Sequence, residues 1–233
     1  MISTLLAVAL STQSWAVAKP AQLRHCHART RAPTLVLDKQ AIRERFNVVP
    51  AFTIVNDAGQ PMASDSQGTP VITFHIDVAE AQALLARIQA SGAEAALKVV
   101  PLGNALAMSS QQSQGAIMKV QSSRAEYARM RQSLGFNVTD VAEPEGGSPQ
   151  IVPLFYSELL KFEESGEQMM PMFFGMDDFR AAWTESGLPA DEMPVQLTDL
   201  RKLQNDLESD ESWLSTVLMP PEASMKFLRG GAG

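Results

Sequence analysis

The sequence is poor in the side chains that most often carry out chemistry. It holds one cysteine and three histidines in 233 residues. Cys26, His25 and His27 all lie in the first 37 residues, so a chain without that segment has no thiol and a single imidazole, that of His75. This excludes disulfides, thiolate nucleophiles and cysteine ligands for a metal. We therefore expect neither a metal centre nor a cofactor.

Two further absences narrow the class of protein. The sequence contains no glycine-rich phosphate-binding loop, no clustered His, Cys and Asp ligands and no Gly-x-Ser-x-Gly motif. The apolar run from Leu5 to Leu10 is much shorter than the roughly 20 residues that span a bilayer. The sequence thus predicts no transmembrane segment, and it is compatible with peripheral association with a membrane.

Negative charge dominates the body of the chain. The whole sequence carries a formal charge of −7, and residues 1–37 contribute four cations and no acid, so residues 38–233 carry −11. An acidic body argues against nucleic acid or anionic lipid as a partner. It suits a protein that handles basic or apolar polypeptide segments.

The first 37 residues have the composition of a targeting leader. Residues 1–18 contain a short apolar run and end in Ala16-Val17-Ala18, which fits the cleavage pattern of a secretory signal. The next fifteen residues are basic and acid-free, like an organelle transit peptide. We expect a plastid address, and a bacterial export signal is the alternative.

An internal repeat organises the rest. Val49-Pro50 matches Val152-Pro153 at a shift of 103 residues, and Phe74-His75-Ile76-Asp77 matches Phe174-Gly175-Met176-Asp177 at a shift of 100. Strand and helix periodicities between these blocks predict two copies of a β-β-α-β-α-β-α unit, side by side and of mixed α/β class. The predicted limits are a leader at 1–37, a first repeat at 38–136, a linker at 137–149 and a second repeat at 150–229.

The ordered blocks VPAFTIVNDAG, KVVPL, IVPLFY, MMPMFFGMDDF and VLMPPEASMKFLR resemble the twenty-two-kilodalton subunit family of the chloroplast inner-envelope translocon, the Tic machinery. The resemblance covers roughly residues 35–229. It implies two pseudo-symmetric halves that form a two-winged single body. It also implies a soluble, chaperone-like factor of the envelope intermembrane space that takes part in protein import into plastids, with precursor proteins and translocon components of both envelope membranes as partners. It brings no catalytic residues. A periplasmic factor for outer-membrane protein biogenesis is the alternative.

Two polar motifs are candidate sites. His75-x-Asp77 matches half of a catalytic dyad, which makes a hydrolase using His75 an alternative function. A histidine at the end of a strand beside a helix N-cap is the more ordinary interpretation. The repeat favours it, because the matching position in the second copy is Gly175 and not a histidine. Asp177-Asp178 matches paired carboxylates for acid–base chemistry, but their position at a helix start favours capping. Asn137-x-Thr139 matches a glycosylation sequon.

The second repeat contains a cluster of methionine and phenylalanine. Methionine side chains are flexible and polarisable, and they recur on surfaces that bind varied apolar partners. Strand alternation turns about half of such residues inward, so an ordinary core is the competing interpretation. The candidate polypeptide-binding surface comprises Met170, Met172, Phe173, Phe174 and Met176.

Overall fold

The computed structural model describes residues 36–66, 68–110, 116–133, 151–189 and 193–230. The predicted leader, apart from its last two residues, the predicted linker and the sequon at Asn137 lie outside them. In the first half the elements are α1 (Lys39–Phe46), β1 (Pro50–Val55), β2 (Ser64–Ser66), β3 (Thr69–His75), α2 (Val78–Ala90), β4 (Ala96–Pro101), α3 (Leu102–Ser110), β5 (Ile117–Gln121) and α4 (Arg124–Ser133).

The second half repeats this order without a counterpart of α1. Its elements are β6 (Pro153–Tyr156), β7 (Phe162–Glu164), β8 (Glu167–Phe173), α5 (Met176–Glu185), β9 (Gln196–Asp199), α6 (Leu200–Ser209), a 3-10 helix (Glu211–Trp213), β10 (Thr216–Met219) and α7 (Glu222–Leu228). The predicted mixed α/β class and element order are confirmed. Each half also contains one short strand, β2 or β7, that the predicted unit lacks.

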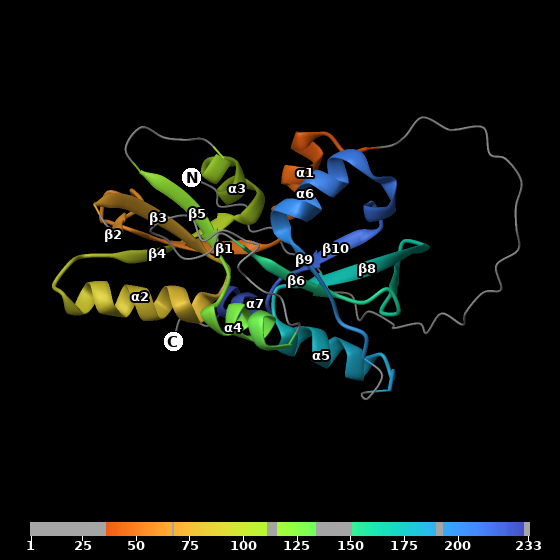
Figure 1. Ribbon diagram of the computed structural model, residues 1–233. Coiled ribbons are helices and arrows are strands. Elements are labelled where there is room, and N and C mark those ends of the chain that lie inside the picture. Colours follow the sequence, from red (N-terminus) through yellow and green to blue (C-terminus); the bar gives the residue numbers. More distant parts are fainter. Residues whose placement is uncertain (1–35, 67, 111–115, 134–150, 190–192, 231–233) are drawn as a thin grey trace, which may run out of the picture.

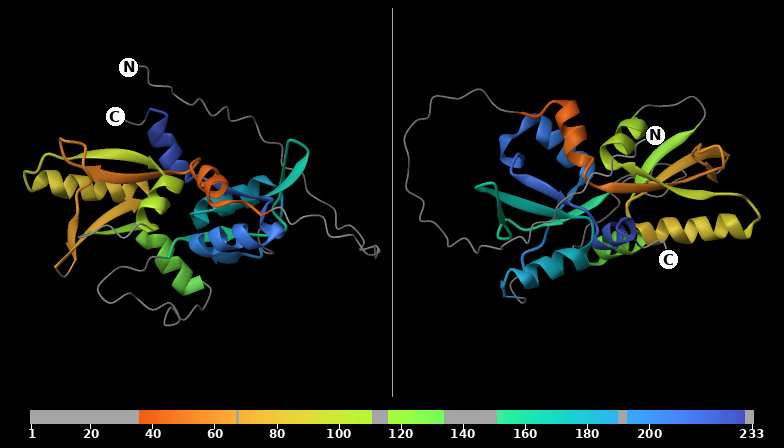
Figure 2. Two further views of the ribbon diagram at one scale, coloured as in Figure 1. Left: turned by 90° about the horizontal axis from the view of Figure 1, so that it is seen from above. Right: turned by 180° about the vertical axis from the view of Figure 1, so that it is seen from behind.

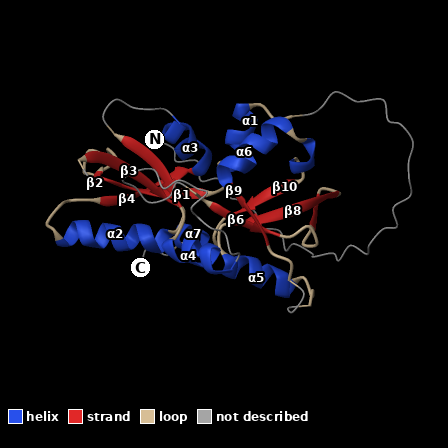
Figure 3. Cartoon of the chain, in the orientation of Figure 1, coloured by secondary structure: helices blue, strands red, loops and turns tan. Residues whose placement is uncertain are grey.

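Each half has one mixed sheet with the same strand order. The order is β5-β3-β1-β4 in the first sheet and β10-β8-β6-β9 in the second, with β2 and β7 pairing with the outer ends of β3 and β8. The outer pairs β3–β5 and β8–β10 are parallel, whereas the pairs made by β1 and β6 are antiparallel. The sheets lie side by side, and both are bordered by helices above and below (Figures 1 and 3).

The structure corrects the alignment of the two copies. Phe52 lies opposite His75, and in the second sheet Phe155 lies opposite Phe173, so His75 corresponds to Phe173 rather than to Gly175. The shift between copies is 103 residues at the first strand but 98 from the next central strand onward. The cause is a shorter path between matched positions of the two strands: 23 positions separate Phe52 from His75, whereas 18 separate Phe155 from Phe173. A match of aromatic letters at a shift of 100 was therefore two residues out of register.

A single hydrophobic core joins the halves. It lies between both sheets and the helices α1, α3 and α6, and it contains Val49 and Ala51 from the first half together with Val152 and Leu154 from the second. The right-hand view in Figure 2, from behind, shows these helices on one side of both sheets, with α2 and α5 on the other. Because neither half could bury this shared apolar surface alone, the two wings form one body.

The last helix of each half lies against the other half. Phe227 of α7 packs edge-on against Phe52 of β1 at 5.8 Å between ring centroids and completes the small core beneath the first sheet. Correspondingly, α4 of the first half contacts β6 and the start of α5. In Figure 1, α4 lies in front of α7 at the middle of the molecule, and the view from above in Figure 2 shows the two helices apart. This exchange brings the starts of four helices, α2, α4, α5 and α7, to one central junction.

Candidate functional site

His75 is a buried residue without a catalytic partner. Its side chain is 7 % exposed, and neither ring nitrogen has a hydrogen-bond partner among the described residues. Burial, together with the nearby cation of Lys119, lowers the pKa of His75 to about 4, so the imidazole is neutral at pH 7. Asp77 instead accepts a hydrogen bond from the backbone N–H of Ala79 at 2.8 Å. The geometry thus gives the hydrolase alternative no support.

The Met/Phe cluster lies mostly inside the protein. Met172, Phe173, Phe174 and Met176 are all buried, with exposed fractions between 0 and 4 %. Met172 and Phe174 belong to the shared core, whereas Phe173 and Met176, the first residue of α5, belong to a second core around Trp183. The strand alternation buries both faces because helices cover both sides of the sheet. A binding surface made of these five side chains is therefore not present, and Met170 alone among them is partly exposed.

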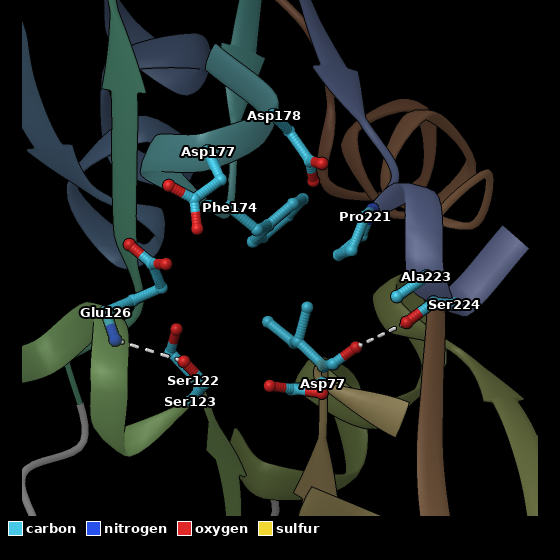
Figure 4. A pocket seen from close by; sticks show the side chains of 12 residues that line it. Asp77, Ser122, Ser123, Glu126, Phe174, Asp177, Asp178, Pro221, Ala223 and Ser224 are labelled. Atoms are coloured by element: carbon cyan, nitrogen blue, oxygen red, sulfur yellow. Dashed lines mark hydrogen bonds between the residues drawn. The ribbon is translucent and has the colours of Figure 1, made fainter. Parts of the chain in front are cut away.

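Where the four helix starts meet, they enclose a pocket of about 160 Å³, which we call the junction pocket. Both halves contribute equivalent positions to its lining: Ile76 in the first half corresponds to Phe174 in the second, and Ser123 corresponds to Pro221. Figure 4 shows carboxylates approaching it from several sides. Its lining consists of Ile76, Asp77, Ser122, Ser123, Glu126, Phe174, Gly175, Asp177, Asp178, Pro221, Ala223 and Ser224.

A carboxylate caps each of the four helices, and three of the four come from a different helix. Asp77 caps its own helix α2, as predicted. Glu80 of α2 accepts from the N–H of Arg124 at the start of α4 (2.6 Å), and Asp178 of α5 accepts from that of Glu222 at the start of α7 (3.3 Å). Glu80 and Asp178 are equivalent in the repeat, so these two contacts are one interaction made twice.

Glu126 of α4 caps α5 across the junction. Its Oε2 accepts from the N–H of Met176 at 3.0 Å, and its Oε1 lies 3.1 Å from Nη1 of Arg129. At the equivalent position of α7, the hydroxyl of Ser224 donates to the carbonyl of Ile76 at 3.0 Å. Burial raises the pKa of Glu126, since a charged carboxylate loses hydration there. These contacts join the two halves through helix starts rather than through strand pairing.

Asp177 and Asp178 do not cap their own helix, which corrects the prediction. Helix α5 begins at Met176, and its N-cap is Gly175, which offers no side chain. Asp177 lies in the first turn and pairs with Arg129 at 2.8 Å, while Asp178 caps α7. Both remain favourably placed near the positive end of the α5 dipole. Burial also raises the pKa of Asp178, assisted by the carboxylates of Glu222 and Asp177.

Glu126 is a residue of this site that was not predicted from the sequence. The signal that was available is the pattern Ser123-Arg124-Ala125-Glu126, a capping box in which the glutamate bonds back to the N–H of the serine. In the structure the hydroxyl of Ser123 accepts from the N–H of Glu126 at 3.1 Å, as that pattern predicts. The carboxylate, however, turns away to Met176. Only the placement of α5 could reveal this.

Neither a metal-binding cluster nor a membrane-spanning helix is found in the part of the chain that the structure describes. No group of three or more His, Cys, Asp or Glu side chains is close enough to hold a metal ion among those residues. Nor is any helix within them long and apolar enough to cross a membrane.

Comparison with known proteins gives a consistent result. The model of the Tic22-like family matches residues 3–227. Among solved structures, Tic22 from Plasmodium falciparum is similar with a TM-score of 0.63 and 20 % identity, covering 80 % of this chain and 95 % of that one. Anabaena Tic22, described with the words protein transport, is similar with a TM-score of 0.60 and 17 % identity, covering 83 % and 97 %.

A search of curated protein sequences finds no match. At these identities the solved structures establish the shared fold, and the family model extends over nearly the whole length of the sequence. The resemblance inferred from the ordered sequence blocks is confirmed: this chain belongs to the Tic22-like family.

Proposed function

We propose that this protein is a non-enzymatic, chaperone-like factor of the plastid envelope intermembrane space that binds precursor proteins during import. Membership of the Tic22-like family over residues 3–227 carries the proposal. The family implies a plastid or cyanobacterial origin, and one structural neighbour is described as acting in protein transport. His75 is buried and has no hydrogen-bond partner among the described residues, so its geometry offers no support for hydrolysis.

Charge supports basic segments as the ligand. Residues 38–233 carry a formal charge of −11, and transit-type segments are rich in Lys and Arg. Long-range attraction between such surfaces raises the association rate and falls as salt screens it. A body of this charge therefore favours encounter with basic precursors over encounter with nucleic acid.

Apolar contact would come from side chains that are partly exposed at the outer end of the second sheet. Tyr156 and Trp213 pack edge-on at 5.8 Å between ring centroids, and Met170 and Leu214 lie partly exposed against the same core. Aromatic and methionine side chains at a surface suit varied apolar ligands. We propose that precursors contact this outer surface, Met170 included, rather than the buried remainder of the Met/Phe cluster.

The test is binding of a fluorescent basic transit-type peptide to the full chain at several salt concentrations. We expect the dissociation constant to rise about tenfold between about 0.05 and 0.5 M salt, because exposed charges are screened. A peptide of the same length with Gln in place of Lys and Arg is the control and should bind weakly at all concentrations. Binding that salt does not change, or no binding, would contradict the proposal.

The alternative location, a bacterial periplasm, is distinguished by the leader. A reporter fused to residues 1–40 should accumulate at the plastid envelope in a plastid-bearing cell if the proposal holds. Export of the same fusion to the periplasm of a bacterium, without delivery to plastids, would favour the outer-membrane assembly factor instead.

A further inference from the structure

Four polar side chains share one face of β3 and β5 in the first sheet. The parallel register places Lys119 beside Thr73 and Gln121 beside His75, and paired residues of neighbouring strands point to the same side of a sheet. This face lies toward α2, because Phe52, opposite His75, belongs to the small core that is made with that helix. We call Thr73, His75, Lys119 and Gln121 the polar patch.

The second half has no equivalent of the polar patch. The shift of 98 residues between the copies places Pro171, Phe173, Val217 and Met219 at the same four positions. Phe173 and Met219 belong to the core around Trp183. The same sheet thus accepts apolar side chains at all four positions, so the fold itself does not require polar residues there.

His75 is the member of the polar patch that lacks a partner most clearly. The residue is only 7 % exposed, and neither ring nitrogen has a hydrogen-bond partner among the described residues. Lys119 and Gln121, beside it on the edge strand β5, are partly exposed, so the patch can be reached from solvent there. Because buried polar groups are normally hydrogen-bonded, an orphan imidazole at this position indicates a polar ligand.

Three cations lie near this imidazole. Burial lowers the pKa of His75, and the charges of Lys119, Arg124 and Arg87 lower it further. Burial, assisted by Arg124, also lowers the pKa of Lys119. Among the described residues, no carboxylate oxygen lies within 4 Å of any of these three cations. The equivalent residues in the second half, none of them a cation, are Glu185, Val217 and Glu222.

Two carboxylates near the polar patch already serve helix starts. Asp77 opposes the effect of the cations on His75, and it accepts from the N–H of Ala79 at 2.8 Å. Glu80 accepts from the N–H of Arg124 at 2.6 Å. Three cations against two carboxylates leave a local excess of positive charge, although residues 38–233 carry a formal charge of −11. An anion would therefore be held by these neighbouring groups and not by the field of the whole molecule.

The set of donors suits a phosphate group better than a carboxylate. Lysine and arginine supply several charged N–H donors, and threonine, glutamine and a neutral imidazole each supply at least one more. A carboxylate offers only two oxygens to such a set. A phosphate monoester offers three oxygens and carries a charge of about −1.5 to −2 at pH 7, which matches both the donors and the unpaired cations.

We infer that the polar patch binds a phosphate group, with Lys119 and Arg124 contacting its oxygens and His75 donating a hydrogen bond from the buried side. The source of this group is a soluble phosphate compound or the headgroup of a phospholipid, and the two are distinguished below. The site is separate from the outer surface proposed for precursors, so it does not depend on the proposed function.

The first experiment titrates inorganic phosphate into the ¹⁵N-labelled full chain at pH 7 and constant ionic strength. The imidazole resonances of His75 are assigned by their absence from His75→Gln. We expect saturable shifts of these resonances and of the Lys119 and Gln121 amides, and acetate should bind about tenfold more weakly. Equal responses to phosphate and acetate, or no saturable response at His75, would overturn the inference and leave a patch that holds only water.

The second experiment repeats the phosphate titration with variants. Lys119→Gln with Arg124→Gln removes two cations from the site and should weaken binding about tenfold. Lys39→Gln with Lys98→Gln removes the same charge from exposed positions elsewhere and should change binding less than about twofold. Arg124→Gln alone, at an exposed position, should weaken binding about threefold, which keeps the test available if the first double variant fails to fold. Equal weakening by both double variants would overturn the site.

Vesicles distinguish the two sources of the phosphate group. The full chain is floated with vesicles of phosphatidylcholine that contain phosphatidic acid, with and without inorganic phosphate as competitor. Flotation that Lys119→Gln with Arg124→Gln abolishes, and that inorganic phosphate competes away, would identify a lipid headgroup. Saturable binding of inorganic phosphate without flotation would identify a soluble phosphate compound. Failure of both measurements would overturn the inference.

Discussion

Replacing Gly103 by alanine should destabilise the protein, although alanine is the better helix former. Gly103 lies near the start of α3, where α1 crosses it, and both helices border the shared core. A Cβ built on Gly103 overlaps the carbonyl oxygen of Arg43 and lies 2.7 Å from Oδ1 of Asn47. The backbone atoms on the α1 side belong to the helix itself, so no side-chain rotation relieves the overlap.

Two effects of opposite sign decide how much Gly103→Ala changes the free energy of unfolding. Helix propensity favours Gly103→Ala by about 1 kcal/mol. Against it, forcing the helices apart costs roughly 1–3 kcal/mol of overpacking. The same movement weakens two bonds between the helices: Asn104 N–H to Asn47 Oδ1 at 3.1 Å and Arg43 Nε to Asn104 Oδ1 at 2.9 Å. Each contributes about 1 kcal/mol. We expect a net loss of about 2 kcal/mol.

The assay is urea unfolding of the full chain at pH 7, followed by circular dichroism. Ala83→Gly on the exposed face of α2 is the matched control, and it should cost about 1 kcal/mol through propensity alone. A Gly103→Ala variant that is as stable as the parent chain, or more stable, would refute the close approach of α1 and α3.

Three further predictions use the same measurement. Folding lowers the pKa of His75 from 6.5 to about 4, so the unfolded chain binds the proton more tightly and the protein loses stability as pH falls below 6.5. The loss by pH 4.5 is about 2–3 kcal/mol, and His75→Phe should remove this loss. An unchanged pH dependence in the variant would show that other groups cause the loss. Glu126 has a raised pKa, so the stabilisation that it contributes declines as pH rises above the ordinary pKa of 4.5. Glu126→Gln, whose amide oxygen still accepts from the N–H of Met176, should therefore gain stability relative to the parent chain between pH 4.5 and 7. A difference in stability between variant and parent that does not change with pH would contradict this. Trp183 is 1 % exposed, so Trp183→Ala should lower the free energy of unfolding by about 3–5 kcal/mol. Trp213→Ala, at a partly exposed position, should lower it by less than half as much. Equal losses in the two variants would mean that the second core is not closed around Trp183.

Helix starts were predicted correctly where neighbouring residues mark them, and wrongly where the prediction relied on matching distant parts of the sequence. Local signals were sufficient for Asp77, which caps α2 as predicted. The corresponding assignment of Asp177 was wrong. It depended on aligning two copies by their aromatic residues, whereas the shift of 98 residues places the equivalent of Asp77 at Gly175 and the helix start at Met176.

Covering elements decided which apolar residues are exposed. The Met/Phe sequence at β8 is equally compatible with a binding face and a core, because the alternation of a strand fixes which residues share a face but not what covers that face. Helix α5 and the shared core cover the two faces, so Met172 and Phe173 are buried on opposite sides.

By itself, the sequence determined the mixed α/β class, the internal repeat, the acidic body and the resemblance to its family, because composition, periodicity and ordered motifs are properties of the chain. Only the tertiary structure decided the junction pocket. Asp77, Ser122 and Asp178 are separated by 45 and 56 residues along the chain, and Glu126 turns from its own capping box to Met176. The exchange of α4 and α7 between the halves brings these groups together, and no local pattern encodes that exchange.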